Sequence, residues 1–302
     1  MGGGRESLCR SEASFMSPES VAVVVVGYQS DETWGAFFDG IRHSTIVPRQ
    51  VVVVENSSNL SPALPSQTEF PLSILHRKDN PGYGASVNAG VAQLTSEVDW
   101  IAYCNADVVL EPDTISQLLS SATVFPRAAI LGPSIANSDG STYPSARAIP
   151  GLRIGAGHAL FGSWWKRNPW TARYLGTYEG IEPRSSGWLS GAFMLVRREV
   201  FEELRGLDEQ YFMYFEDVDL CLRTKALGYR CVYVPRARIT HLGGHSTSTN
   251  PREMMRAHHR SAEIFLGKLY PKRIHTPLRI LLRASLRLRR LIADSYISKR
   301  QV

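Results

Sequence analysis

The sequence predicts an α/β protein with a Rossmann-like, mostly parallel sheet, flanked by helices and followed by a C-terminal helical appendage. Short β-branched apolar runs such as VAVVVVGY (21–28) and QVVVVEN (50–56) are typical of strands buried on both faces of a parallel sheet. Segments of helical length alternate with these runs, as βα units require. Polar clusters follow the strands where they end, and open parallel sheets bind ligands outside the carboxyl ends of their strands.

The first half of the chain predicts the order strand, helix, strand, strand, helix, strand, helix. Asp31 is the expected N-cap of the first helix, and Pro112 suits the first position of the last one. The expected ranges are 21–28, 31–43, 50–56, 72–77, 84–94, 99–107 and 112–122.

The second half is less regular. Residues 136–186 are rich in Gly, Pro, Trp and Arg, and we expect a long mobile segment there with some helix. Residues 187–201 predict a strand that leads into a helix, and Gly228 ends an amphipathic helix that opens at residue 216. The remaining expected elements are strands at 229–235 and 237–244 and helices at 251–269 and 276–293.

Composition sets the broad class of the protein. With 302 residues, 43% of them hydrophobic, the chain can form one large domain with an appendage. We expect a disordered leader at 1–20, a main domain at 21–250 and C-terminal helices at 251–302. Four cysteines without a CxxC pair favour free thiols and a reducing, cytoplasmic compartment. No window approaches the roughly 18 apolar residues of a membrane span.

Positive charge is concentrated at the C-terminus. Residues 271–302 hold nine Lys or Arg and one acid, and the rest of the chain is nearly neutral. The basic and apolar sides of the helix at 276–293 favour a peripheral position on anionic lipid at the inner face of the plasma membrane. Docking onto the protein's own domain, or onto a second copy in a homo-oligomer, is an equal alternative. Nucleic acid is excluded as a partner because the tail lacks interleaved stacking aromatics.

A first polar cluster, Asn105-Ala106-Asp107, closes the strand at 99–107. A carboxylate there can bind Mg²⁺ or Mn²⁺, which in turn can bridge diphosphate oxygens. The alternative is an ordinary turn, since Asn and Asp are common turn residues. Glu55-Asn56 closes the expected strand at 50–56. The Glu55 carboxylate can accept a hydrogen bond from a pyrimidine N3–H, or it can simply begin a polar loop.

The glycine-rich run NPGYGASVNAG (80–90) leads into a helix. Gly82 and Gly84 let the backbone approach a ligand closely, and the helix N-terminus that follows favours anionic groups. The run is not a dinucleotide fingerprint, because Val87 occupies the position of the third glycine.

Three carboxylates, Glu216, Asp217 and Asp219, open the helix at 216–228. Acids are favoured at a helix N-terminus, so capping is the plain interpretation. Crowding of like charges also raises the pKa of one of them, which suits a general base that takes a proton from a hydroxyl. The aromatic run before them (211–215) is either a sugar-stacking wall or a core stripe.

Two histidines, His241 and His245, follow a short strand beside glycines. Lone histidines are usually structural, and the cysteines do not complete a zinc site. We therefore expect His241 to share a Mg²⁺ or Mn²⁺ site with Asp107.

In this order the motifs resemble those of family 2 glycosyltransferases of the GT-A fold, over about residues 20–268. The matching segments are VVVVGYQSDE, VVVVENSS, NPGYGASVNAG, YCNADVVLEPD, GWLSGAFMLVRR, FMYFEDVDLCLR and THLGGHS. They are most similar to the bacterial rhamnosyltransferase branch, whose members transfer rhamnose from dTDP-rhamnose to a polyprenyl-diphosphate-linked sugar or a polysaccharide.

The resemblance implies a nucleotide-sugar half at 21–135, an acceptor half at 136–250, and a role for each candidate residue. The implied metal ligands are Asp107 and His241, with Asn105 in place of the first Asp of the family's DxD motif. Asp217, beside Glu216, is the implied catalytic base. The implied nucleotide-sugar contacts are Gly27, Tyr28, Glu55, Asn56, Asn80, Gly82, Gly84, Asn88, Asn105 and Ala106. The implied acceptor contacts are Trp188, Gly191, Asp219 and His245.

The implied reaction is a single in-line displacement with inversion at the anomeric carbon. Two rival interpretations stay open at this point. One is a family 2 enzyme that uses a UDP- or GDP-sugar to transfer galactofuranose, mannose or glucose. The other is a catalytically silent scaffold of envelope assembly.

Overall fold

A computed structural model of the chain describes residues 19–287, except positions 60, 62, 96, 151–167, 169–170, 172–173, 175–179 and 244–250. Residues 1–18 of the expected leader and His245 therefore lie outside the described residues, as does the end of the expected last helix beyond residue 287.

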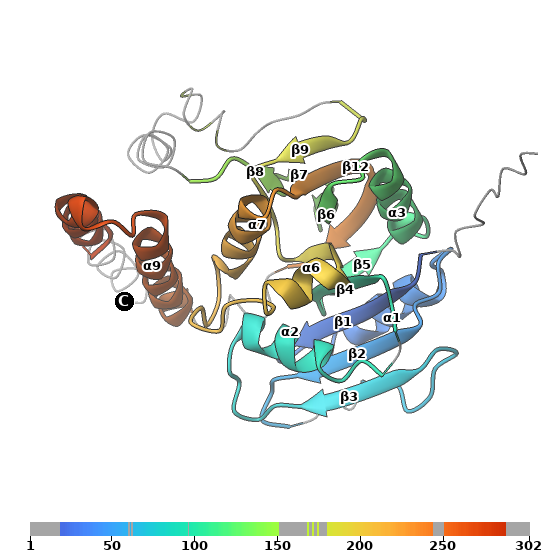
Figure 1. Ribbon diagram of the computed structural model, residues 1–302. Coiled ribbons are helices and arrows are strands. Elements are labelled where there is room, and N and C mark those ends of the chain that lie inside the picture. Colours follow the sequence, from blue (N-terminus) through green and yellow to red (C-terminus); the bar gives the residue numbers. More distant parts are fainter. Residues whose placement is uncertain are drawn as a thin grey trace, which may run out of the picture.

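In the described part of the chain, ten strands form the main sheet, whose central path runs β3-β2-β1-β4-β11-β6-β12-β5 (Figure 1). The pairs β3–β2, β2–β1, β1–β4 and β6–β12 are parallel, whereas β11 runs antiparallel between β4 and β6. The strands are β1 (Val21–Gly27), β2 (Gln50–Glu55), β3 (Leu72–His76), β4 (Trp100–Asn105), β5 (Val108–Leu110), β6 (Ala128–Asn137), β7 (Thr142–Tyr143), β8 (Ala146–Arg147), β9 (Arg184–Ser186), β10 (Trp188–Leu189), β11 (Phe193–Arg197) and β12 (Arg230–His241).

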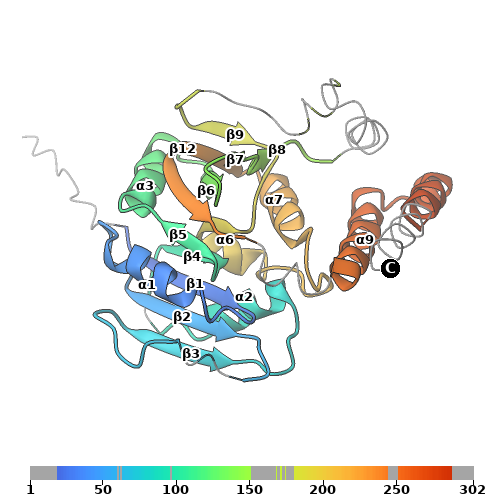
Figure 2. The same ribbon diagram turned by 180° about the vertical axis from the view of Figure 1, so that it is seen from behind.

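Helices cover both faces of the sheet, as Figures 1 and 2 show from opposite sides. The helices are α1 (Trp34–Arg42), α2 (Tyr83–Val91), α3 (Thr114–Val124), α6 (Arg198–Glu203), α7 (Glu216–Ala226) and α9 (Pro251–Leu269). Alternate residues of β1 divide between two cores. Val23 packs with α1 and α3, and Val24 packs with α2, α6 and α7. Burial on both faces explains why these strands are continuous apolar runs.

The predicted strands and helices of the first half are confirmed, with ends that differ by up to three residues. Asp31 was wrong as the N-cap of α1, because the helix begins at Trp34 and Thr33 occupies that position. In the second half, two expected strands are one strand, β12, which has a register shift between Val234 and Arg238. Strands β5 to β9 were not predicted. The last three lie in the expected mobile segment at 136–186, much of which is outside the described residues. β6 (AAILGPSIAN) contains Gly132 and Pro133, which weakened its strand pattern.

The helix α9 coincides with the range predicted from sequence, and residues 276–287 form a further helix. Both stand at the side of the molecule beyond α7 (Figure 1). The cysteines in the described part, Cys104, Cys221 and Cys231, are buried free thiols, as expected. Among the described helices, none is long and apolar enough to cross a membrane.

Candidate active site

A cavity of about 630 Å³ lies where β1 and β4 end, and the N-terminus of α7 forms part of its wall. Its lining comes from distant parts of the chain: the residues after β1, the turn after β4, the end of β12, the start of α7 and one side of α9. Asp107, Asp217 and His241 all line it. The three side chains that carry the expected chemistry therefore share one space at the expected edge of the sheet.

One corner of this cavity is formed by the turn after β4 and the end of β12. β5 begins directly after Asp107 and pairs antiparallel with β12, which places His241 opposite Val108. Asp107 Oδ1 lies 3.1 Å from His241 Nε2, and the two side chains are 20% and 25% exposed. The Asn105 amide nitrogen lies 3.2 Å from the same imidazole nitrogen. Strand pairing thus fixes a carboxylate and an imidazole side by side with access to solvent.

This corner fits a divalent cation that is completed by substrate. Two ligands of one octahedral Mg²⁺, each about 2.1 Å from the ion, lie about 3 Å apart, which is close to the separation of Asp107 Oδ1 and His241 Nε2. Within the described ranges no group of three or more His, Cys, Asp or Glu gathers to hold a metal ion. The remaining ligands would have to be water and diphosphate oxygens, which is the usual composition of Mg²⁺ sites at nucleotides.

The opposite part of the cavity is built around Asp217. Tyr214 and Phe215 have φ values of 69° and 70°, so the chain enters α7 through two consecutive left-handed residues. The ring of Phe215 packs against Phe265 of α9, with centroids 5.3 Å apart. Left-handed non-glycine residues are strained and persist only where packing holds them. Here that conformation turns the first residues of α7 toward the cavity.

Two backbone amides hold the Asp217 carboxylate. Gly191 N donates to Oδ2 at 3.0 Å and Val218 N donates to Oδ1 at 2.7 Å. A Cβ on residue 191 would come within 3.2 Å of the Asp217 side chain, so a larger residue there would press on this carboxylate. The Tyr83 hydroxyl donates to Gly191 O at 2.7 Å and fixes this loop from the side of α2.

Burial raises the pKa of both neighbouring carboxyls. Desolvation dominates for Asp217, and the amides of Gly191 and Val218 and the charge of Arg147 oppose it. For Glu216, desolvation and then the charge of Asp217 raise the pKa well above its ordinary value. Glu216 Oε2 is buried without a hydrogen-bond partner, and a backbone hydrogen bond to the carboxyl offsets only part of the cost of burial. The pair therefore consists of one carboxyl that tends to stay protonated and one that is more basic than a free aspartate.

We expect Glu216→Gln to change how stability depends on pH. A carboxyl whose pKa is raised on folding contributes stability that is present below its unfolded pKa, about 4.5, and lost as pH rises through the folded pKa. The wild type should therefore lose free energy of unfolding relative to the variant as pH increases, by at most about 1.4 kcal/mol per pH unit. Denaturant titrations between pH 4 and 8 measure this. Exposed Glu203→Gln is the control, and parallel curves for wild type and Glu216→Gln would disprove the assignment.

The expected nucleotide-sugar residues divide into two groups. The first group lines the cavity: Gly27, Tyr28, Asn56, Asn80, Asn105 and Ala106. Glu55, Gly82 and Gly84 lie behind the wall instead. Glu55 accepts hydrogen bonds from Ser57 N at 3.0 Å and Ser57 Oγ at 2.6 Å, and its Oε2 is buried without a partner. That oxygen lies directly behind Gly27, where an added Cβ would come within 3.2 Å of it.

The glycine-rich run is held by the loop that precedes α7. Gly82 has a φ of 97°, and a Cβ there would clash with the backbone of Phe212. Tyr83 N donates to Phe212 O at 2.9 Å. Gly82 thus lets the start of α2 dock against residues 211–215, and Tyr83 rather than the glycines faces the cavity.

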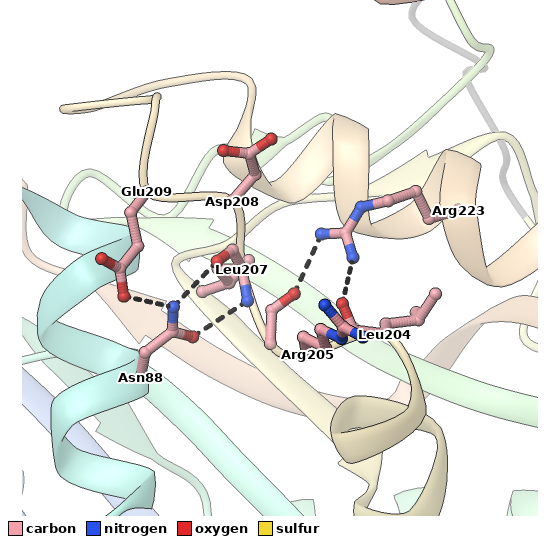
Figure 3. Close-up of a pocket in the computed structure, with 8 residues that line it drawn as sticks. Asn88, Leu204, Arg205, Leu207, Asp208, Glu209 and Arg223 are labelled. Carbon is pink, nitrogen blue, oxygen red and sulfur yellow. Dashed lines mark hydrogen bonds between the residues drawn. The ribbon is translucent and has the colours of Figure 1, made fainter.

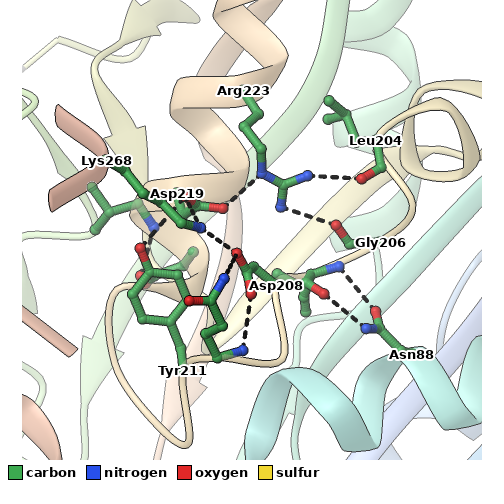
Figure 4. Close-up of polar contacts among 12 residues, drawn as sticks. Asn88, Leu204, Gly206, Asp208, Tyr211, Asp219, Arg223 and Lys268 are labelled. Carbon is green, nitrogen blue, oxygen red and sulfur yellow. Dashed lines mark hydrogen bonds and ion pairs between the residues drawn. The ribbon is translucent and has the colours of Figure 1, made fainter. Parts of the chain in front are cut away.

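Of the expected acceptor residues in the described chain, Trp188 and Gly191 line the cavity and Asp219 does not. Asn88, expected at the nucleotide, is also absent from the lining. Asn88 instead brackets Leu207, donating to its carbonyl at 2.8 Å and accepting from its amide at 2.9 Å, beside a separate pocket of about 370 Å³ (Figure 3). The side chains of Asn88 and Asp219 both belong to a polar network beside α7 (Figure 4).

This network joins α7, α9 and the loop 204–209 (Figure 4). Arg223 donates to Asp219 at 2.6 Å and to the carbonyls of Leu204 and Gly206, both at 2.9 Å. Lys268 of α9 donates to Asp219 at 2.9 Å and to Asp208. The Asp219 side chain is only 2% exposed, so its charge depends on these two cations. The network anchors the helix that carries Asp217.

We expect Lys268→Met to lower the free energy of unfolding by about 1–3 kcal/mol, because a nearly buried carboxylate loses one of its charged donors. Chemical denaturation of the full chain measures the change. Arg42→Met is the matched control: its ion pair with Asp39 is exposed, so the change should stay within about 0.5 kcal/mol. Equal effects of the two substitutions would show that the network does not stabilise α7.

Several cavity residues were missed by sequence reasoning. Arg147 lines the cavity amid Tyr143, Tyr174 and Trp188, and α9 adds Glu253, Met254 and His258. Arg147 lies in the segment 136–186, which has no clear periodicity, so no sequence pattern marked it. The residues of α9 look like the ordinary surface of an amphipathic helix, and only the packing of α9 beside α7 reveals them.

Comparison with known proteins gives the class. Residues 18–262 match the family described as "Glycosyltransferase like family 2". The chain is 40% identical over 279 residues to an N-acetylglucosaminyl-diphospho-decaprenol L-rhamnosyltransferase of Mycobacterium tuberculosis, covering 88% of this chain and 90% of the relative. It is 40% identical over 81 residues to Rhamnosyltransferase WbbL of Escherichia coli, covering 27% of this chain and 31% of that protein.

Solved structures share the fold. GalNAc-T7, crystallised with UDP, GalNAc and Mn²⁺, superposes with a TM-score of 0.54 at 13% identity, over 75% of this chain and 44% of that one. The mannosyltransferase PcManGT of Pyrobaculum calidifontis, in complex with GDP-Man and Mn²⁺, gives a TM-score of 0.51 at 15% identity, over 82% and 62%. This chain thus spans less than two thirds of either structure.

The fold is therefore GT-A, a mixed, mostly parallel sheet flanked by helices, and the molecule is a glycosyltransferase. More narrowly, the chain belongs to family 2 of the glycosyltransferases, in its rhamnosyltransferase branch.

Proposed function

We propose that this protein is an inverting, metal-dependent glycosyltransferase that moves L-rhamnose from dTDP-rhamnose to a polyprenyl-diphosphate-linked sugar. The observation that carries the proposal is the shared cavity, in which the Asp107–His241 pair and the Asp217 carboxylate face one space. The mycobacterial relative, with 40% identity over most of both chains, supports the sugar and the acceptor class.

In this proposal the donor lies on the side of β1 and β4. Asn56 and Asn80 supply polar contacts there, and Glu55 Oε2, a buried acceptor without a partner, meets the N3–H of thymine by a small movement of the wall at Gly27. Asp107 and His241 would hold Mg²⁺ or Mn²⁺, and the bound ion would neutralise the charge that develops on the leaving diphosphate.

Asp217 acts on the acceptor. Its carboxylate, aligned by the amides of Gly191 and Val218, takes the proton of the acceptor hydroxyl as that oxygen attacks the anomeric carbon. Burial makes this carboxylate a stronger base than a free aspartate. Attack from the face opposite the leaving diphosphate inverts the anomeric configuration.

The test is a transfer assay with purified protein, Mn²⁺ and a panel of dTDP-rhamnose, UDP-galactofuranose, UDP-glucose and GDP-mannose. The acceptor is N-acetylglucosaminyl-diphospho-polyprenol, and mass spectrometry of the lipid product identifies the sugar added. Transfer of a deoxyhexose from the dTDP donor supports the proposal. Transfer of a hexose from UDP or GDP donors favours the rival enzyme, and absence of transfer from every donor favours a silent scaffold.

We also propose that the C-terminal helices place this enzyme peripherally on an anionic membrane. The helix at 276–287 packs back toward α9, where Arg287 Nε lies 3.5 Å from a Glu263 carboxylate oxygen. Three large apolar side chains nevertheless point to solvent: Ile274, Ile280 and Leu281, exposed by 82%, 63% and 67%. Arg279 lies between them in sequence, and Lys272, Arg273 and Arg283 flank them. Apolar side chains among cations suit an anionic lipid surface.

We expect wild-type protein to co-sediment with phosphatidylglycerol vesicles and the triple variant Ile274→Ser/Ile280→Ser/Leu281→Ser to lose most of that binding. Each substitution removes an apolar contact worth about 1–3 kcal/mol when buried in lipid. Val124→Ser is the control, because Val124 is 71% exposed on α3, far from the C-terminal helices. Undiminished binding of the triple variant, or of protein lacking residues 271–302, would refute lipid contact through this segment.

A further inference from the structure

Arg147 is a cation of the cavity wall that the mechanism above does not use. It belongs to β8, which pairs antiparallel with β10 so that Arg147 lies opposite Trp188. Its guanidinium carbon lies 5.0 Å from the ring centroid of Tyr143, 5.1 Å from that of Trp188 and 5.9 Å from that of Tyr174. All four residues line the cavity. Three aromatic rings thus hold one guanidinium in place.

The hydrogen bonds of this guanidinium leave much of its donor capacity for a ligand. Arg147 Nε donates to Pro144 O at 2.6 Å, and the Tyr174 side chain is a further partner. Within the described chain no carboxylate lies within ion-pair distance of Arg147. A guanidinium has five N–H donors, and a cation without a carboxylate at a cavity wall suits an anionic ligand.

The position of Arg147 relative to the base indicates which ligand this is. Its strand partner Trp188 is separated from Gly191, which holds Asp217, by only two residues. The positive charge of Arg147 also opposes the rise that burial causes in the pKa of Asp217. The metal corner is formed by other elements, the turn after β4 and the end of β12. Arg147 therefore belongs to the side of the cavity from which the acceptor reaches the base.

We propose that Arg147 binds the diphosphate of the lipid-linked acceptor. The inference rests on the proposed function, in which the acceptor sugar carries its diphosphate at the anomeric carbon. One sugar ring separates that group from the hydroxyl that Asp217 deprotonates, so the diphosphate must lie close to the base. The donor has its own cation at Asp107 and His241, and the second diphosphate needs another. A guanidinium fixed by aromatic rings can bind phosphate oxygens in a bidentate manner.

Two acceptors separate the phosphate contact from every other role of this residue. N-acetylglucosaminyl-diphospho-farnesol carries the diphosphate, and octyl N-acetylglucosaminide presents the same sugar without phosphate. We expect Arg147→Gln to lower kcat/KM on the diphosphate acceptor by about 10- to 100-fold, mainly through the acceptor KM. On the octyl glycoside the change should be less than about threefold, and the KM for the donor should not move. Arg147→Lys should give an intermediate loss, because it keeps the charge without the planar fork.

Arg197→Gln is the matched control. Its guanidinium also stacks on an aromatic ring, 4.6 Å from the centroid of Trp100, but neither residue lines the cavity. It should affect both acceptors equally and weakly. Thermal unfolding monitors the fold of each variant, and Arg147→Lys carries the test if Arg147→Gln does not fold.

Equal losses on the two acceptors would overturn the inference and leave the proposed function intact. A rise in the donor KM would assign Arg147 to the donor's diphosphate and would equally overturn it. Failure of the wild type to transfer to either acceptor would instead reject the proposed function, and the inference with it.

Discussion

Asp217→Asn should reduce kcat by about 10²- to 10⁴-fold while donor binding survives. The asparagine side chain keeps the shape of aspartate and one oxygen that can accept from the backbone N–H groups of Gly191 and Val218. It cannot take a proton from the acceptor hydroxyl. Because the proposed function places this carboxylate on the acceptor side of the cavity, the affinity for dTDP in the presence of Mn²⁺ should change by less than about threefold, a small fraction of the binding energy.

Steady-state kinetics and the thermal shift produced by dTDP measure the two effects on the same protein. Asp139→Asn is the control, because Asp139 caps an exposed turn through Ser141 and lies outside the cavity. Full activity of Asp217→Asn would remove the base assignment. Loss of dTDP binding together with activity would place Asp217 at the donor instead.

Asp107→Ala should reduce kcat/KM by at least about 10²-fold and abolish the response to added Mn²⁺. In the proposed metal site the Asp107 carboxylate is the anionic ligand, so its loss leaves His241 without an anionic partner there. Binding of dTDP should become insensitive to the metal. Chelation of the wild type with EDTA should reproduce the variant, and Mn²⁺ should restore only the wild type.

Titration of Mn²⁺, followed by electron paramagnetic resonance in the presence of dTDP, gives the affinity directly. Asp113→Asn is the control, because that side chain interacts with Gln117 on α3, outside the cavity. His241→Ala should weaken the binding of Mn²⁺ less than Asp107→Ala does, because a neutral imidazole supplies no negative charge to the ion. An Asp107→Ala protein that keeps metal-dependent turnover would exclude this corner as the metal site.

The parallel half of the fold was predictable because its strands are buried on both faces, which makes β1, β2 and β4 unmistakable apolar runs. β6 is as deeply buried, yet Gly132 and Pro133 interrupt its pattern. Pro133 is tolerated where the register of β12 shifts, at Val234, a feature of pairing that no local pattern reveals.

The candidate site divides in the same way. Asp107 lies in the turn directly after β4, and Asp217 lies in the first turn of α7. Local sequence patterns predicted both positions. The topology of the fold then brings both side chains to one cavity. Asn88 was predicted to contact the nucleotide because it lies in the glycine-rich run. Its side-chain amide instead forms hydrogen bonds with the backbone of Leu207 in the loop 204–209. Arg147, by contrast, lines the cavity although no sequence pattern predicted it. Its aromatic partners, Tyr143, Tyr174 and Trp188, come from separate segments of the chain.

The anomeric configuration of the transferred sugar is the sharpest test of the proposed single displacement. The proposed mechanism, with Asp217 as the base and a leaving diphosphate at the Asp107–His241 corner of the same cavity, is a single displacement without a covalent sugar–enzyme intermediate. Proton NMR of the product formed from dTDP-rhamnose should show the anomeric configuration opposite to that of the donor. A product with the donor's configuration would require a second displacement by a nucleophile of the protein. The proposed mechanism contains no such nucleophile, so this result would contradict it.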